Sequence, residues 1–246
     1  MSVLRRGAGV LSRRLGRPEL LAAVDPHARQ AQREEVAIRA VLAACLRGEP
    51  TYVDAGTNRG QVLRDAALVA PRARLIAFEP VPALAAGLRA AFPGLDCREL
   101  ALGAEQGRAQ FTHFRKLDGW SGLRRSPEIS DEQGAPETIE VTVSTLDHEL
   151  AGIDPAVVKI DVEGAELDVL RGGREMLARS QPILVFEHVP SAAALYGAAT
   201  EEIWELLTGL GYELSELTGS PPLTREGFLA AAGTAVNWLG RPQAAS

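Results

Sequence analysis

Cysteine is scarce in this chain: among 246 residues only Cys45 and Cys97 occur, and they form no CxxC pair. This excludes a framework of disulfide bonds and a zinc site built from cysteine thiolates. Such cysteine usage suits a reducing compartment, so we expect a cytoplasmic protein. Long apolar runs are missing as well, and none approaches the roughly 20 residues of a membrane-spanning helix. We therefore expect no integral membrane segment.

A general excess of positive charge is also missing. The formal net charge is -6 at pH 7, whereas nucleic-acid binding usually needs a basic face. The N-terminus is the exception, because an acid-free run of arginines occupies it: Arg5, Arg6, Arg13, Arg14 and Arg17. This run is typical of a surface helix or a frayed tail. A second interpretation is a peripheral contact with an anionic membrane or a lipid-linked substrate.

The chain is long enough to bury one large core, and 46% of its residues are hydrophobic. We expect an N-terminal basic and helical extension over residues 1–50 and one α/β domain over residues 51–246. The extension is predicted to be helical from about Pro18 to Arg47, and Gly48-Glu49-Pro50 ends it. After it, strands and helices alternate, which predicts a parallel sheet covered on both faces.

The same alternation sets the bounds of several later elements. We expect a third strand over about Asp96–Leu102, an extra pair of strands at Arg108–Phe114 and Thr138–Val143, and one helix from Ala165 to about Ala178.

The first strand of this domain leads into a glycine-rich turn. A short apolar strand, Tyr52–Asp54, ends in an acid, and the turn up to Gly60 precedes a helix from about Gln61 to Val69. Glycines let the backbone approach a ligand closely, and the N-terminus of the helix offers unpaired N–H donors. This unit predicts a site for a nucleotide-like cofactor.

Acids follow several of the predicted strands. Asp54 ends the first strand, Glu79 the second, Asp161 the fourth and Glu187 the fifth. Because ligands of open α/β sheets bind outside the carboxyl ends of the strands, we expect these acids along one rim. Each acid taken alone is also typical of a helix N-cap, and the repetition of the pattern favours the shared site.

The spacing of the turn bears on the choice of cofactor. An acid at the position of Glu79 commonly hydrogen-bonds the ribose hydroxyls of an adenosine. The turn reads Asp54-x-Gly56-x-Asn58-x-Gly60, and it lacks the glycine spacing of a pyrophosphate-binding loop. An acid beside the turn suits the cationic amine of S-adenosyl-L-methionine. An NAD-dependent oxidoreductase on a similar sheet stays open as the alternative.

Four blocks then occur in order between Tyr52 and Leu239. They are Val53-Asp54-Ala55-Gly56-Thr57-Asn58-Arg59-Gly60, Ala77-Phe78-Glu79-Pro80, Ser144-Thr145-Leu146-Asp147 and Lys159-Ile160-Asp161-Val162-Glu163-Gly164-Ala165-Glu166. Together they resemble the FkbM family of S-adenosylmethionine-dependent methyltransferases. The last block is the most specific of the four.

The resemblance implies a Rossmann-like class I methyltransferase fold, with a seven-stranded mostly parallel sheet, helices on both faces and an antiparallel last strand. It also implies O-methylation of a hydroxyl on a sugar, glycolipid or polyketide-type natural product. Carried over by position, the residues that line the methionine part of the cofactor are Asp54, Gly56, Asn58 and Gly60. By the same resemblance, Glu79 and the adjoining Pro80 would bind the ribose, and Ala101 and Leu102 would lie near the adenine.

An aliphatic hydroxyl is barely acidic, so a base that takes its proton helps methyl transfer by about two to four orders of magnitude. Asp161 is the first candidate for this base, followed by Glu187 and His188. The same three residues could bind Mg²⁺ or Mn²⁺, but no ligand spacing requires it, and no metal is predicted. Alternatively, Asp161 caps the next helix and His188 is an ordinary loop residue.

Two further segments are candidates for the acceptor side. The polar stretch from Arg115 to Glu137 holds Trp120 and is predicted to cover the site, and Tyr196 is another candidate contact. The expected partner is a small-molecule or glycan acceptor. A methyltransferase-like binding protein without turnover is the second alternative, and the strand-end acids argue against it.

Overall fold

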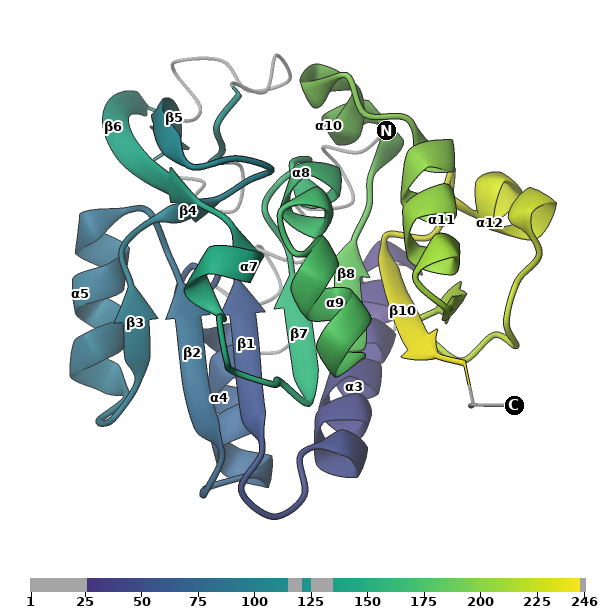
Figure 1. Ribbon diagram of the computed structural model, residues 1–246, viewed down its shortest axis with the longest axis horizontal. Coiled ribbons are helices and arrows are strands. Elements are labelled where there is room, and N and C mark those ends of the chain that lie inside the picture. The colour runs from purple at the N-terminus through teal and green to yellow at the C-terminus, as the bar shows by residue number, and fades with distance from the viewer. Residues whose placement is uncertain (1–25, 115–120, 125–134, 244–246) are drawn as a thin grey trace.

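The computed structural model describes residues 26–114, 121–124 and 135–243. Seven strands form its central sheet: β1 (Thr51–Ala55), β2 (Arg74–Phe78), β3 (Asp96–Arg98), β7 (Val157–Ile160), β8 (Ile183–Glu187), β9 (Tyr212–Glu216) and β10 (Asn237–Pro242). They lie in the order β3-β2-β1-β7-β8-β10-β9 (Figure 1). β10 runs antiparallel to β8 and β9, and the remaining pairs are parallel. The predicted class I methyltransferase sheet is therefore confirmed.

Helices cover both faces of this sheet. Behind it in Figure 1 lie α3 (Pro26–Cys45) and α4 (Gln61–Val69), and α5 (Pro82–Ala91) lies at its β3 edge. In front lie α7 (Leu146–Glu149), α8 (Glu166–Arg171), α9 (Arg174–Ser180) and α11 (Thr200–Gly209). The remaining helical elements are α10 (Pro190–Ala193), η2 (Ala194–Tyr196) and α12 (Arg225–Ala231).

The strands alternate their side chains between these two layers, as the pleat of a strand requires. In β1, Tyr52 packs in a core with Leu42 of α3 and Leu63 of α4. Its neighbour Val53 packs in the opposite core, which contains Leu167 of α8. The sheet is thus buried on both faces, and its carboxyl rim is the place where polar side chains gather.

A second, three-stranded sheet has the order β4-β6-β5 and consists of β4 (Ala101–Leu102), β5 (Gly107–Phe114) and β6 (Pro136–Ser144). The predicted pair at 108–114 and 138–143 is confirmed as β5 and β6. The prediction of one continuous strand over 96–102 is wrong. The chain turns after Arg98, where Leu100 N–H donates to the Arg98 carbonyl at 3.1 Å, and β4 then pairs with β6 instead.

The prediction of one helix from Ala165 to about Ala178 is also wrong, because Gly172 and Gly173 separate α8 from α9. A Cβ atom on Gly172 would lie 2.1 Å from the Gly103 carbonyl oxygen, and one on Gly173 would lie 2.9 Å from Leu146 Cδ1. The two glycines therefore allow a close approach between the helical layer and the start of the second sheet.

The described part of the N-terminal extension packs on the α/β domain. The core that holds Tyr52 also contains Ile38 and Leu42 of α3 and Leu46, which directly follows that helix. In addition, Asn237 Nδ2 donates to Glu34 Oε2 at 2.9 Å. The arginine-rich first seventeen residues lie outside the described part of the chain. Among the helices that are described, none has the length and apolar character to cross a bilayer.

Candidate active site

The turn after β1 is shaped by the neighbouring strand. Gly56 has φ +80°, and a Cβ atom there would lie 1.8 Å from the Asp161 carbonyl oxygen. The backbones are close because Asp161 N–H donates to the Ala55 carbonyl at 2.9 Å. Gly60 has φ +73°, and its Cβ would lie 2.7 Å from Leu88 Cδ2 of α5. Gly56 is therefore required by the backbone contact, and both glycines are favoured by their left-handed conformation.

Glu79 is fixed against this turn. Its carboxylate accepts the Asn58 N–H at 2.8 Å and the Val81 N–H at 3.0 Å, and the residue is 4% exposed. Asn58 adopts a left-handed conformation with φ +51°, which directs its N–H toward the next strand. Pro80, which lies between Glu79 and Val81, is half-buried. The structure thus brings the predicted ribose residue Glu79 to the predicted turn residue Asn58.

Beside the turn, a buried lysine joins two of the strand-end acids. Lys159 Nζ lies 3.4 Å from Asp54 Oδ1 and 3.3 Å from Asp161 Oδ2. Burial opposes the charge of Lys159, but Asp161 and Asp54 outweigh it and raise its pKa. Burial raises the pKa of Asp54, and Lys159 opposes that shift. Lys159 therefore stays charged and compensates two carboxylates at the end of β1 and β7.

Three carboxylates gather at the rim beyond this lysine. Ligand oxygens of Asp161, Glu163 and Glu187 lie within 4.8 Å of one another. Sequence reasoning grouped Asp161 and Glu187 with His188, whereas the structure brings Glu163 to them. Glu163 has φ +60°, so the backbone turns sharply between Asp161 and Gly164. Oxygen donors of this kind could hold a hard divalent cation or the hydroxyls of an acceptor.

His188 lies away from these carboxylates, among the contacts of α11. It is fully buried, its Nε2 lies 2.9 Å from Thr200 Oγ1, and its N–H donates to the Val236 carbonyl at 2.8 Å. Burial lowers the pKa of His188 to about 4, so the ring is neutral at pH 7. In this structure His188 holds the start of α11, and Glu187 is the member of the pair that reaches the acidic rim.

Glu166 is a residue of the site that sequence reasoning missed. Its Oε1 accepts the N–H groups of Val162 and Gly164, both at 3.0 Å, and burial raises its pKa to about 7. Asp161 was alternatively expected to cap the next helix, but α8 begins at Glu166 with no side-chain cap. The signal for Glu166 in the sequence was an acid two residues after Gly164, at the start of a predicted helix.

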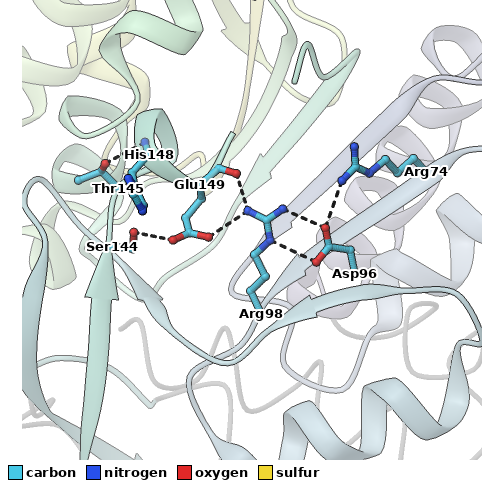
Figure 2. A network of polar contacts seen from close by, with 7 residues as sticks. All are labelled: Arg74, Asp96, Arg98, Ser144, Thr145, His148 and Glu149. Carbon is cyan, nitrogen blue, oxygen red and sulfur yellow. Dashed lines mark hydrogen bonds and ion pairs between the residues drawn. The ribbon is translucent and has the colours of Figure 1, made fainter. Parts of the chain in front are cut away.

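Ala101 and Leu102, the residues assigned to adenine, lie in β4 and are buried. A polar network runs from Asp96 through Arg98 to Glu149 and Ser144 (Figure 2). Ser144 lies opposite Leu102 in the β4–β6 ladder. Through β6, β4 is thus connected to the end of β3 by side-chain hydrogen bonds.

Tyr196, the predicted acceptor contact, is the last residue of η2. Its hydroxyl accepts the Arg124 N–H at 2.9 Å, and a Cβ atom on Gly122 would lie 3.0 Å from the same oxygen. Burial raises the pKa of Tyr196 to about 12. Tyr196 therefore holds the segment 121–124 against η2. Trp120 lies outside the described residues, so its predicted role as a cover stays a prediction.

The family described as the methyltransferase FkbM domain matches residues 54–214. The chain belongs to the FkbM methyltransferase family. The match begins at Asp54 and contains Glu79, Asp161 and Glu187, so it confirms the resemblance inferred from the four sequence blocks.

Two curated relatives and one solved structure are similar to this chain. The 2-O-methyltransferase NoeI of Sinorhizobium fredii is 32% identical over 159 residues, which cover 58% of this chain and 65% of NoeI. Methyltransferase sdnD of Sordaria araneosa is 30% identical over 163 residues, which cover 52% and 62%. The chain thus spans just under two thirds of each relative. The crystal structure of methyltransferase FkbM from Methylobacillus flagellatus is 15% identical with a TM-score of 0.48, covering 80% of this chain and 45% of that one.

Proposed function

We propose that this FkbM-family protein transfers a methyl group from S-adenosyl-L-methionine to a hydroxyl oxygen of a small-molecule or glycan acceptor. The observation that carries the proposal is the meeting of Asp54, Glu79 and Asp161 around one glycine turn at the carboxyl rim of a class I sheet. The 2-O-methyltransferase relative supports transfer to oxygen. A sugar, glycolipid or polyketide-type hydroxyl is the proposed acceptor.

The residues around the turn suit this cofactor chemically. Glu79 holds its carboxylate beside the turn through two backbone N–H bonds, and carboxylate oxygens accept the two hydroxyl protons of a ribose. Asp54 and Asp161 together carry one more charge than Lys159 compensates, and this net negative charge beside the turn favours a cationic amine over a pyrophosphate. Ala101 and Leu102 offer an apolar strand of the kind that suits adenine.

When bound, the cofactor supplies an electrophilic sulfonium methyl, and the protein supplies alignment and a base. In the proposed mechanism a carboxylate oxygen of Asp161, whose side chain is 33% exposed, takes the hydroxyl proton as the acceptor oxygen bonds to the methyl carbon. The bond from that carbon to sulfur breaks in the same displacement, and its electron pair stays on the departing neutral thioether. Lys159 balances the carboxylates of Asp54 and Asp161 before that transfer. Glu187 and Glu163 lie close enough to Asp161 to orient neighbouring hydroxyls of the acceptor.

Calorimetry with S-adenosylhomocysteine, and separately with NAD, tests the cofactor. We expect the wild type to bind S-adenosylhomocysteine, and Glu79→Ala to weaken that binding by roughly tenfold or more, since charged hydrogen bonds contribute about 1.5–3 kcal/mol. Binding of NAD in its place would support the oxidoreductase alternative. Unchanged affinity in Glu79→Ala would remove the ribose assignment.

Methyl transfer to a panel of sugars, glycolipids and polyketide-type alcohols tests catalysis. Asp161→Asn should keep the affinity for S-adenosylhomocysteine and lose about two to four orders of magnitude in turnover. Asp168→Asn is the matched control, because this acid pairs with Arg171 on α8 and should retain turnover. Full turnover in Asp161→Asn would show that another group takes the proton. Cofactor binding without transfer to any acceptor would favour the binding-protein alternative.

A further inference from the structure

Arg98 occupies the place where the two sheets meet. It is the last residue of β3, and β4 begins three residues later. Its guanidinium binds Asp96 through two bonds, Nε to Oδ1 at 3.2 Å and Nη2 to Oδ2 at 2.9 Å. Its Nη1 donates to Glu149 Oε2 at 2.9 Å and also to the Glu149 carbonyl oxygen (Figure 2). One half-buried cation therefore connects a strand of the main sheet to α7.

The connection continues from α7 to the second sheet. Glu149 Oε1 accepts the Ser144 hydroxyl at 2.7 Å, and Ser144 lies opposite Leu102 in the ladder between β4 and β6. Each bond in this chain involves a charged group, and charged hydrogen bonds are stronger than neutral ones. The position of β4 thus depends on the contact between Arg98 and Glu149.

Arg98 also contacts the end of β2. Its carbonyl oxygen accepts the N–H of Glu79 at 3.1 Å, and its guanidinium carbon lies 5.5 Å from the centroid of the Phe78 ring. Phe78 directly precedes Glu79 and faces Arg98 in the β2–β3 register. One residue therefore contacts the strand end that carries the ribose carboxylate and, through Glu149, the strand assigned to adenine.

We propose that Arg98 is a positioning residue that fixes the adenosyl half of the cofactor site by setting Glu79 and β4 relative to each other. The proposal rests on the cofactor assignment of the preceding subsection. Arginine suits this role because its planar fork binds two acceptors in fixed directions, whereas lysine offers a point charge. The hydrogen bond from Arg98 to Asp96 holds the pKa of Asp96 below its usual value, which keeps the anchoring pair charged.

The chain offers a matched control for the test. Arg74 binds the same Asp96 carboxylate, with Nη2 3.3 Å from Oδ2, and within the described contacts it does not reach Glu149. Arg74→Met and Arg98→Met both remove an arginine from Asp96, but only Arg98→Met cuts the connection to α7. Arg98→Lys retains the positive charge but loses the planar guanidinium that binds two acceptors. It provides a second variant for the test if Arg98→Met folds poorly.

Calorimetry would measure the affinities of these variants for S-adenosylhomocysteine and for 5′-methylthioadenosine, which shares only the adenosyl half. We expect both Arg98 variants to weaken both ligands by the same factor, roughly tenfold, and Arg74→Met to change them by less than about twofold. Melting temperatures without ligand should be similar for Arg98→Lys and Arg74→Met. In turnover assays KM for the methyl donor should rise while kcat stays unchanged.

A combined variant shows whether Arg98 acts through Glu149. Arg98→Met with Glu149→Gln should bind no worse than Arg98→Met alone, because both changes break one connection. Additive losses, or equal affinities of the Arg98 and Arg74 variants, would overturn the inference while the cofactor assignment stands. A wild type that binds neither ligand would overturn the cofactor assignment, and this inference with it.

Discussion

Lys159 Nζ lies 3.4 Å from Asp54 Oδ1, and the register of β1 on β7 pairs these two residues directly. Side chains opposite each other on neighbouring strands point to the same face, so this register brings the charges together. Asp161 lies two residues after Lys159, on the same side of the chain, and adds the second carboxylate at 3.3 Å. The ion pair is therefore a property of the sheet, and it places one cation beneath the rim where the proposed reaction occurs.

Removal of this cation should be strongly destabilising. Lys159→Met leaves Asp54, which is 1% exposed, as a buried carboxylate without its partner, and such losses cost about 3–5 kcal/mol. Urea unfolding at pH 7 measures the change in the free energy of unfolding. The double variant Lys159→Met with Asp54→Asn should recover part of the loss, because it removes the uncompensated charge together with the lysine.

An exposed pair provides the control. Arg179 and Asp154 are 45% and 71% exposed, and exposed ion pairs contribute about 0–1 kcal/mol. Arg179→Met should therefore cost far less than Lys159→Met. Similar losses in the two variants would mean that the buried charge of Asp54 finds compensation elsewhere, and the interpretation of Lys159 as its neutralising partner would be wrong.

The rim itself could be predicted from the sequence, because the carboxyl ends of parallel strands meet at one edge. Asp54 and Glu187 lie at the carboxyl end of a strand with a clear apolar pattern, and Glu79 and Asp161 directly follow such a strand. The partner of Asp54 could not be predicted in the same way, since Lys159 is 105 residues away in the chain and only the strand register brings it near. The sequence grouped His188 with Asp161 and Glu187, whereas the structure places Glu163 there. This error has a similar cause, because the direction of a side chain after a strand depends on backbone turns.

Errors in the predicted elements arise from contacts between segments that are distant in the chain. The break between α8 and α9 arises where Gly172 approaches the Gly103 carbonyl, a contact between segments far apart in the chain. The turn after Arg98 is likewise set by pairing of β4 with β6. An apolar pattern identifies a buried strand or helix, but it does not identify which sheet a strand joins. Such choices depend on packing between elements.

Gly56 should be far less tolerant of substitution than a glycine with the same backbone conformation in open space. Gly56 and Gly94 have φ +80° and +85°, but a Cβ atom on Gly94 would have nothing within 4 Å. Gly94→Ala should therefore cost only the conformational strain, about 1–2 kcal/mol. Gly56→Ala adds a clash with the Asp161 carbonyl, which brings a further cost of about 1–3 kcal/mol. Urea unfolding of the two variants measures the difference.

Cofactor binding separates these two variants further. Gly56→Ala moves β1 away from β7 or distorts the turn, so its affinity for S-adenosylhomocysteine should fall, while Gly94→Ala should bind as the wild type does. If Gly56→Ala were as stable as Gly94→Ala and bound the ligand equally well, the turn would have space for a Cβ atom at position 56. The predicted clash with the Asp161 carbonyl oxygen would then be wrong.

Glu166 and His188 should give the free energy of unfolding opposite dependences on pH. The pKa of Glu166 is raised by burial from 4.5 to about 7, so its contribution is full below pH 4.5 and is lost as the pH rises to about 7. The pKa of His188 is lowered by burial from 6.5 to about 4, so its contribution is full above pH 6.5 and is lost as the pH falls to about 4. Each amounts to about 3 kcal/mol over its range.

Between pH 4.5 and 6.5 the two contributions oppose each other, so single variants should reveal them. Relative to the wild type, the stability of Glu166→Gln should rise with pH across this range, and that of His188→Gln should fall. Denaturant unfolding at half-unit steps of pH measures the three curves, and the double variant should return to the slope of the wild type. A variant curve parallel to that of the wild type would show that the substituted group does not change its protonation on unfolding in this range, because a buried group with a shifted pKa must bind or release a proton when the chain unfolds.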